Sequence, residues 1–381
     1  MELYLHLPFC RSKCRYCDFA SYPGREDEMA RYCQCLMREL AGFSPVGQPL
    51  ETIFIGGGTP SLVPPRLLAP VLQAVASHFR IQPGAEFTCE ANPGTLTPDF
   101  LAMLREAGCN RLSLGAQAAQ PALLKTLGRI HTWAEVEASV GLARETGFDN
   151  LSLDLMFGLP GQTLAQWEET LSRALALAPR HLSCYGLIVE EGTPFFSLSQ
   201  HGRLLLPDEE TERAMYDRAL HLLAQAGLQP YELSNFAQPG YECRHNLGYW
   251  RQTPYLGLGA AAHSLLPCAR AQGAYLRRGN TPSLDAYMAG VEAGRPVYSE
   301  HTFVSPEEAQ FETLMLGLRT LEGVSEKAFE KRHGVPLAGR FGPALSRLER
   351  QGLLRHENGA WRLSRRGMDV QNAVLVSLMP D

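Results

Sequence analysis

The chain has 381 residues, of which 45% are hydrophobic and 20% are charged, and its formal net charge at pH 7 is -5. This length suits one large domain plus a smaller one, and the acidic balance argues against nucleic-acid partners, which are bound by neutralising phosphates. No apolar run reaches the roughly 18 residues that span a bilayer, and the chain begins on a strand-like run rather than a signal peptide, so we expect a cytoplasmic protein that is not transmembrane.

Six short apolar runs are predicted as strands, and each is followed by a segment with helical periodicity. The runs are residues 3–7, 52–56, 86–90, 111–115, 151–156 and 182–187. Near-continuous apolar strands that alternate with helices indicate parallel βαβ units. The sequence therefore predicts an α/β fold built on a partial barrel of six β/α units.

Polar or glycine-rich groups follow every predicted strand. In chain order they are a cysteine-rich loop, GGGTPS (56–61), EANPG (90–94), GAQ (115–117), Asp154 with FGLPGQT, and Tyr185. In a parallel barrel the active site lies at the carboxyl ends of the strands. Glycines at single turns are common, but polar groups at all of these ends together predict a ligand site.

We divide the chain into residues 1–200, the partial barrel, residues 201–300, a segment that closes the barrel, and residues 301–381, a C-terminal module. A helix near 208–226 opens the second part. The module is predicted to hold helices at 305–321, 325–333 and 339–351, a hairpin with an Asn358-Gly359 turn, and a closing helix. This mostly helical order resembles a winged helix. Its nearly balanced charge disfavours DNA binding and favours a packing or protein-contact role.

Three cysteines, Cys10, Cys14 and Cys17, lie in the segment HLPFCRSKCRYCDF. A structural zinc site normally needs four ligands, and a disulfide suits neither three thiols nor a reducing compartment. Buried thiols do not explain three cysteines among basic residues. An iron–sulfur cluster remains, and three thiolates on a [4Fe–4S] cube leave one iron open. We favour the cluster, whose negative charge the basic residues would offset.

The C-x3-C-x2-C spacing after a first strand resembles the radical S-adenosylmethionine (SAM) family, in which the open iron binds SAM and an electron from the cluster cleaves it. The segments YLHLPFC, GGGTPS, EANPG, RLSLGAQ, LGRIH, DLMFGLPGQT and YELSNFA also resemble the oxygen-independent coproporphyrinogen III oxidase group along nearly the whole chain.

The resemblance implies a set of SAM contacts at matching positions. Tyr4 would lie near the cluster and the sulfonium, and Tyr16 between two of the cysteine ligands. The methionine part would be held by Gly57, Gly58 and Thr59, the ribose and carboxylate by Glu90, Gln117, Arg129 and Asp154, and the adenine by Ile188.

The segment HNLGYW, residues 245–250, resembles the H-N-x-x-Y-W signature of HemW-type haem chaperones. An imidazole such as His245 is a common ligand to haem iron, Tyr249 and Trp250 could stack on a porphyrin, and Arg244 could pair with a propionate. Ordinary aromatic packing around a hydrogen-bonded histidine explains the same residues equally well. Cys243 and His263 are alternative ligands with less support.

The resemblance predicts a haem chaperone that delivers haem to apo-haemoproteins of respiration, with peripheral membrane contact left open. The alternative is an oxygen-independent coproporphyrinogen III dehydrogenase. Two features disfavour it: Phe19 stands where such oxidases carry a further cysteine, and the chain starts on its first strand. We therefore expect SAM binding without this decarboxylation, and SAM cleavage stays open. A regulatory winged-helix protein is a third interpretation, which the charge disfavours.

Overall fold

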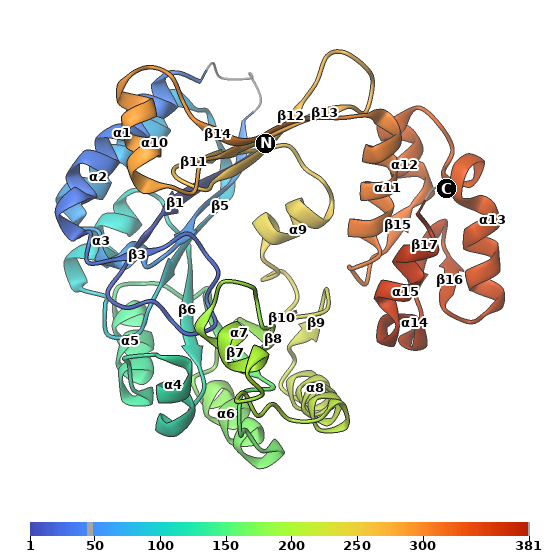
Figure 1. The fold of residues 1–381 in the computed structure, drawn as a ribbon, viewed down its shortest axis with the longest axis horizontal. Coiled ribbons are helices and arrows are strands. Elements are labelled where there is room, and N and C mark those ends of the chain that lie inside the picture. Colours follow the sequence, from blue (N-terminus) through green and yellow to red (C-terminus); the bar gives the residue numbers. More distant parts are fainter. Residues whose placement is uncertain (44–48, 380–381) are drawn as a thin grey trace.

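The computed structural model describes residues 1–43 and 49–379. All six predicted strands are present and pair in parallel in chain order (Figure 1). They are β1 (Glu2–Leu7), β4 (Leu50–Gly57), β5 (Ile81–Ala91), β6 (Arg111–Gln117), β7 (Leu151–Phe157) and β8 (His181–Gly186). The prediction of a partial β/α barrel is confirmed.

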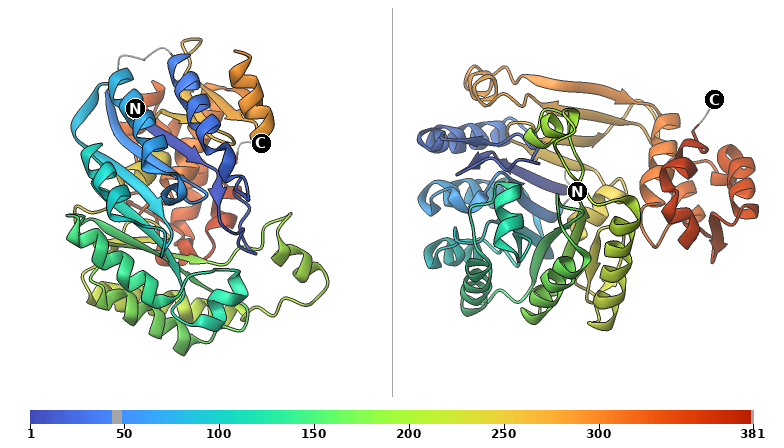
Figure 2. Two further views of the ribbon diagram at one scale, coloured as in Figure 1. Left: turned by 90° about the vertical axis from the view of Figure 1, so that its left-hand side faces the viewer. Right: turned by 60° about the horizontal axis from the view of Figure 1, so that its bottom comes forward.

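Helices follow these strands and cover the outer face of the curved sheet (Figures 1 and 2). They are α1 (Met29–Ala41), α2 (Pro65–His78), α3 (Pro98–Glu106), α4 (Pro121–Leu127), α5 (Trp133–Glu145), α6 (Leu164–Ala176), α7 (Pro194–Gln200) and α8 (Glu209–Gln225). Several begin at threonines whose hydroxyls accept a backbone N–H bond, as Thr97 does from Phe100 at 3.2 Å. Thr132 and Thr163 form full capping boxes.

The barrel strands have two chemically different faces, because successive side chains point to opposite sides. In β6, Leu112 and Leu114 are fully buried in the core beneath the helices. Arg111 and Ser113 instead line a cavity inside the barrel. The interior of a β/α barrel is usually filled with branched apolar side chains. Here polar side chains line it and leave space for a ligand.

Residues 201–300 add strands to both edges of the sheet. On the β8 edge lie β10 (Asn235–Ala237) and β9 (Gln229–Pro230), both antiparallel. On the β1 edge lie the parallel strand β11 (Tyr255–Leu258) and then the antiparallel strands β12 (His263–Pro267), β13 (Tyr275–Asn280) and β14 (Tyr298–Val304). The twelve-stranded sheet stays open, and this segment extends it at both edges.

Short elements complete this part of the molecule. They are β2 (Phe9–Cys10), β3 (Tyr22–Pro23), the 3-10 turns η1 (Glu26–Glu28) and η2 (Pro60–Leu62), and the helices α9 (Arg244–Trp250) and α10 (Leu284–Glu292). None of the helices in the described residues is long and apolar enough to cross a bilayer.

The C-terminal module lies beside the open side of the barrel (Figure 1). It contains α11 (Pro306–Gly317), β15 (Val324–Ser325), α12 (Glu326–His333), α13 (Leu337–Arg350), β16 (Leu354–Glu357), β17 (Ala360–Leu363), α14 (Arg365–Asp369) and α15 (Gln371–Val376). The predicted hairpin turn has positive φ at Asn358 and Gly359 (54° and 70°), while the expected closing helix is broken at Val370. The module has its own apolar core, which supports our proposal that it is a separate domain.

Candidate functional site

The loop that carries the three cysteines crosses the carboxyl ends of the barrel strands and is held by backbone hydrogen bonds. The Arg15 N–H donates to the Leu127 carbonyl at 2.9 Å, and the Arg15 carbonyl accepts from Phe195 at 3.1 Å. The Thr59 N–H donates to the Phe9 carbonyl at 2.7 Å. The loop is therefore attached to α4, α7 and the glycine-rich turn after β4.

The three cysteines are free and partly buried, and they line one cavity of about 150 Å³. Burial raises the pKa of Cys10, and a hydrogen bond with Thr59 partly opposes this rise. Burial also raises the pKa of Cys17. The Arg129 guanidinium, just after α4, donates to the Cys14 sulfur at 3.6 Å, so a partly buried cation suited to thiolate ligands lies beside the loop.

The arrangement of the thiols distinguishes between two kinds of metal centre. Within residues 1–43 and 49–379, no three His, Cys, Asp or Glu side chains converge where one metal ion could sit. Structural zinc requires such convergence. A [4Fe–4S] cube instead takes each thiolate on a different iron. Three thiols that line one cavity fit a cluster, which takes one thiolate on each of three irons.

The turn after β4 requires glycine at two positions. Gly57 has φ +111°, and a Cβ there would lie 2.5 Å from the His6 ring. A Cβ on Gly58 would lie 2.6 Å from the Phe9 carbonyl oxygen and 3.0 Å from the Cys10 sulfur. The absence of side chains therefore lets the backbone approach the cysteine loop closely.

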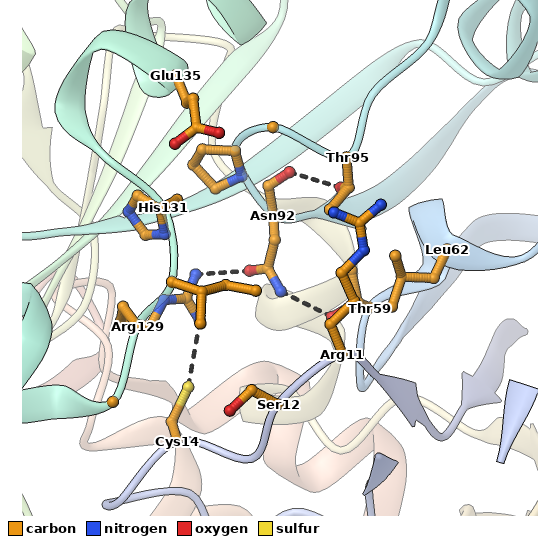
Figure 3. A pocket seen from close by; sticks show the side chains of 14 residues that line it. Arg11, Ser12, Cys14, Thr59, Leu62, Asn92, Thr95, Arg129, His131 and Glu135 are labelled. Atoms are coloured by element: carbon orange, nitrogen blue, oxygen red, sulfur yellow. Dashed lines mark hydrogen bonds between the residues drawn. The ribbon is translucent and has the colours of Figure 1, made fainter. Parts of the chain in front are cut away.

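A hydrogen-bond network joins this turn to Arg129 (Figure 3). Arg129 donates to the Asn92 side-chain oxygen and to the Gly115 carbonyl, both at 2.6 Å. Asn92 in turn donates to the Thr59 hydroxyl at 2.7 Å. Asn92 is not among the site residues predicted from the sequence. It lies in the EANPG segment, and the position of that segment at the end of a strand is the sequence feature that could have identified it.

Two partly buried carboxyl groups, those of Glu90 and Asp154, line the same cavity. Burial, helped by Asp154, raises the pKa of Glu90 to about 8, and Glu90 accepts the Gly57 N–H at 3.1 Å. Burial also raises the pKa of Asp154, although hydrogen bonds from Ser183 and Ser113 oppose the rise. Glu90 is therefore mostly protonated at neutral pH and can donate as well as accept a hydrogen bond.

Most of the predicted cofactor residues are brought together. The 150 Å³ cavity is lined by Cys10, Cys14, Tyr16, Cys17, Gly57, Gly58, Glu90, Gln117, Arg129 and Asp154. Gln117 has φ +62°, an uncommon conformation for a residue with a side chain.

Three other predicted contacts lie outside this cavity. Thr59 lines a smaller neighbouring cavity (Figure 3), and Tyr4 lines the barrel lumen, where its hydroxyl bonds to His6 at 3.0 Å. Ile188 is 69% exposed and lines a separate groove beside β8.

His245 lies on α9, inside the amino end of the barrel. Its side chain is 1% exposed and stacks on Phe54 with a centroid distance of 5.0 Å. Nδ1 bonds to the Thr52 hydroxyl at 2.7 Å, and Nε2 bonds to the Tyr249 hydroxyl at 2.9 Å. Burial lowers the pKa of His245 to about 3, so the ring is neutral. His245 would have to give up its hydrogen bond with Tyr249 or with Thr52 before a ring nitrogen could bind iron.

Helix α9 is anchored by two carboxylic acids that the sequence did not single out. The Glu86 carboxylate accepts from the backbone N–H groups of Arg244 (2.9 Å) and His245 (3.1 Å). Burial raises the pKa of Glu2 to about 9, so the 4.0 Å contact between Glu2 and His245 joins two neutral groups and is not an ion pair. A Cβ at Gly248 would overlap the Glu2 carboxyl group, so α9 packs directly on it.

The haem-motif residues point in different directions. His245 and Tyr249 line a lumen cavity of about 300 Å³ beneath the cysteine site. Trp250 lines another cavity against the C-terminal module, with the Arg319 guanidinium 5.7 Å from its ring. Arg244 is exposed and donates to the Gly84 carbonyl at 2.8 Å. The structure therefore groups His245 with Tyr249 and separates them from Trp250 and Arg244.

Comparison with known proteins agrees with this geometry. Residues 4–174 match the radical SAM superfamily, and residues 304–370 match the HemN C-terminal domain. The heme chaperone HemW of Bacillus subtilis is 39% identical over 97% of both chains. HemW of Escherichia coli is 35% identical over 98% of this chain and 97% of its own. A bovine mitochondrial radical S-adenosyl methionine domain-containing protein 1 is 35% identical over 99% of this chain and 87% of its own.

A solved structure shows the same fold. Coproporphyrinogen III oxidase (HemN) from Escherichia coli, described as a radical SAM enzyme, superposes with a TM-score of 0.83 over 99% of this chain and 89% of that chain, at 21% identity. Several relatives are similar in sequence over nearly the full length of the chain, so the family assignment does not rest on the fold alone. The chain belongs to the HemW family of the radical SAM superfamily.

Proposed function

We propose that the protein binds a [4Fe–4S] cluster through Cys10, Cys14 and Cys17, with SAM beside it. The observation that carries this proposal is the shared cavity, which three free thiols line together with the glycine turn and the partly buried carboxyl groups. When bound, such a cluster supplies the electron for reductive cleavage of SAM.

The residues of this chain have distinct roles in holding the cofactors. Arg129 offers a cation beside Cys14, and Asn92 fixes the Arg129 guanidinium. The backbone at Gly57 and Gly58 admits the amino-acid end of SAM, because nothing projects from either residue. Glu90 and Asp154 are the polar groups for the ribose hydroxyls. The exposed Ile188 reaches an adenine only if the groove beside β8 closes on it.

We further propose that the protein is a haem chaperone, as several relatives are named, that delivers haem to respiratory apo-haemoproteins in the cytoplasm. Tyr249 and His245 face the lumen on a short helix, and Tyr249 blocks one ring nitrogen of His245. Release of that bond would free Nε2 as an iron ligand. Trp250 and Arg244 lie outside the lumen, so any haem contact they make is on the surface.

A transfer assay tests this function against the dehydrogenase alternative. Protein reconstituted anaerobically with iron and sulfide is loaded with haem and mixed with an apo-cytochrome, and formation of the holo-cytochrome is followed by absorbance. We expect transfer from the protein to exceed transfer from free haem at the same concentration. A parallel reaction with coproporphyrinogen III, SAM and reductant should yield no carbon dioxide. Carbon dioxide release without haem transfer would favour the dehydrogenase.

A further inference from the structure

The lumen cavity contains a buried cation for which the described residues provide no direct partner. Arg111, the first residue of β6, is 2% exposed and lines the 300 Å³ cavity. Its Nε has no hydrogen-bond partner, and none of the ion pairs formed within residues 1–43 and 49–379 includes its guanidinium. Buried charges in folded proteins are almost always paired, because desolvation is costly. The charge therefore calls for an anion or ordered water in the cavity.

The carboxylates whose charges act on this cation, those of Glu86 and Asp154, already accept hydrogen bonds from other groups. Both oxygens of Glu86 accept bonds from the start of α9. The Asp154 oxygens accept from the Ser113 hydroxyl at 3.1 and 3.3 Å. Burial alone would lower the pKa of Arg111. Cys243, Glu86 and other neighbours raise this pKa by more than burial lowers it, so the guanidinium is charged. Glu90, with a pKa of about 8, is mostly neutral at pH 7 and adds little negative charge to the lumen.

The walls of the cavity indicate the rest of the ligand. Tyr4, Phe54, Tyr185 and Tyr249 line it with aromatic rings. Tyr185 also lines a groove of about 480 Å³ beside β8, whose apolar surface includes Phe157, Leu187, Ile188, Tyr216 and Met368. Tyr185 is thus a wall shared by both spaces. The lumen cavity thus forms a chamber that sets the Arg111 guanidinium among aromatic walls, with Glu90 and Asp154 also lining it.

We infer that Arg111 binds a carboxylate on a short side arm of a ring-shaped ligand in the barrel lumen. Resting on the haem function proposed above, this ligand is a porphyrin and the arm is one of its propionates. A bidentate guanidinium–carboxylate pair would satisfy the buried charge. Arg111, and not the exposed Arg244, is then the residue that selects a porphyrin with free propionates.

The chamber can be tested without haem. 3-Phenylpropanoate, a ring with a propionate arm, and its uncharged methyl ester are titrated into wild-type protein, and the thermal unfolding midpoint is followed. We expect a concentration-dependent rise with the acid and none with the ester. Arg111→Met should abolish the rise, and Arg111→Lys, which keeps the charge with fewer donors, should reduce it. A rise that is equal for acid and ester, or that survives Arg111→Met, would overturn the chamber.

Haem and its dimethyl ester then test the identity of the ligand. We expect wild-type protein to bind haem about 10- to 100-fold more tightly than the diester, the range for a hydrogen bond to a charged group. Arg111→Met should remove this preference, whereas the matched control Arg244→Met should keep it. Equal affinity for haem and diester, or loss of the preference in Arg244→Met alone, would overturn the propionate assignment. Failure of wild-type protein to bind either form contradicts the haem function, while the phenylpropanoate result still decides the chamber.

Discussion

The two ends of the barrel lumen are built in opposite ways. At the carboxyl end, three half-buried thiols and two side-chain-free glycines surround a cavity, and the Arg129 network holds them in place. At the amino end, α9 fills the opening, and His245 is 1% exposed with both ring nitrogens bonded. The first end is preorganised for a ligand, whereas the second must exchange a hydrogen bond before it binds one.

The difference in preorganisation between the two ends affects how tightly each end would hold a ligand. A preorganised site binds without a conformational cost, because its groups already point at the ligand. A site that must first break internal bonds binds more weakly by the free energy of that opening. Such a site suits cargo that is passed on, and the carboxyl end suits a resident cofactor.

The largest expected effect comes from removing the thiols of the carboxyl end. After anaerobic reconstitution, wild-type protein should hold about four iron atoms per chain, and Cys10→Ala/Cys14→Ala/Cys17→Ala close to none. Iron and sulfide analysis measures this. Cys268→Ala, a partly buried cysteine remote from the loop, is the control and should load fully. Full loading of the triple variant would refute the cluster assignment.

The glycine turn should be nearly as sensitive. Gly58→Ala introduces a Cβ against the Phe9 carbonyl and the Cys10 sulfur, so the loop must shift. We expect cluster loading or SAM affinity to fall at least ~10-fold, with about 1–3 kcal/mol lost from stability as for other overpacked sites. Gly141→Ala, at an exposed position of α5 with open space, should change neither. Normal SAM binding by Gly58→Ala would show that the turn tolerates a side chain.

The six barrel strands could be predicted because each is a short apolar run bounded by turn residues. The strands β11 to β14 were missed, because their glycines and exposed aromatics leave no periodic pattern. Their positions depend on pairing with β1, a long-range contact that no local signal encodes.

The candidate site shows the same division between local motifs, which the sequence reveals, and long-range contacts, which it does not. The cysteines and the glycine turn are contiguous motifs, so the sequence located them. Glu86, Asn92 and Arg111 matter through contacts with distant segments: Glu86 with α9, Asn92 with Arg129, and Arg111 with the lumen. Whether a strand residue faces helices or lumen depends on the register of the sheet, and a single sequence does not give that register. Ile188 was predicted by resemblance alone and lies outside the cofactor cavity.

The closed state of the amino end can be tested through stability. His245→Ala leaves the hydroxyls of Thr52 and Tyr249 without their shared partner and removes the ring stacked on Phe54. We expect a loss of about 2–4 kcal/mol in the free energy of unfolding in urea. His263→Ala is the control, because that side chain is 49% exposed, and it should cost less than about 0.5 kcal/mol. Equal, small losses in both variants would mean that α9 does not close the lumen in solution.

The smallest effect concerns Glu2, whose buried carboxyl group lies under α9 and is protonated because its pKa is raised from 4.5 to about 9. Between these two values the folded state holds a proton that the unfolded chain has released, so wild-type stability falls as pH rises through this window. Glu2→Gln removes the titration. We expect this variant to gain about 1–2 kcal/mol over the wild type between pH 6.5 and pH 7.5, measured as the difference of unfolding free energies.

A matched control separates this titration from the general effect of charge. Glu106→Gln, which removes an exposed carboxylate at the end of α3, is the control for a change of one unit in net charge. If the gain of Glu2→Gln is independent of pH, Glu2 is ionised in the folded state. The 4.0 Å contact beneath α9 would then join a carboxylate to the neutral His245 ring, and the amino end of the lumen would hold a buried charge.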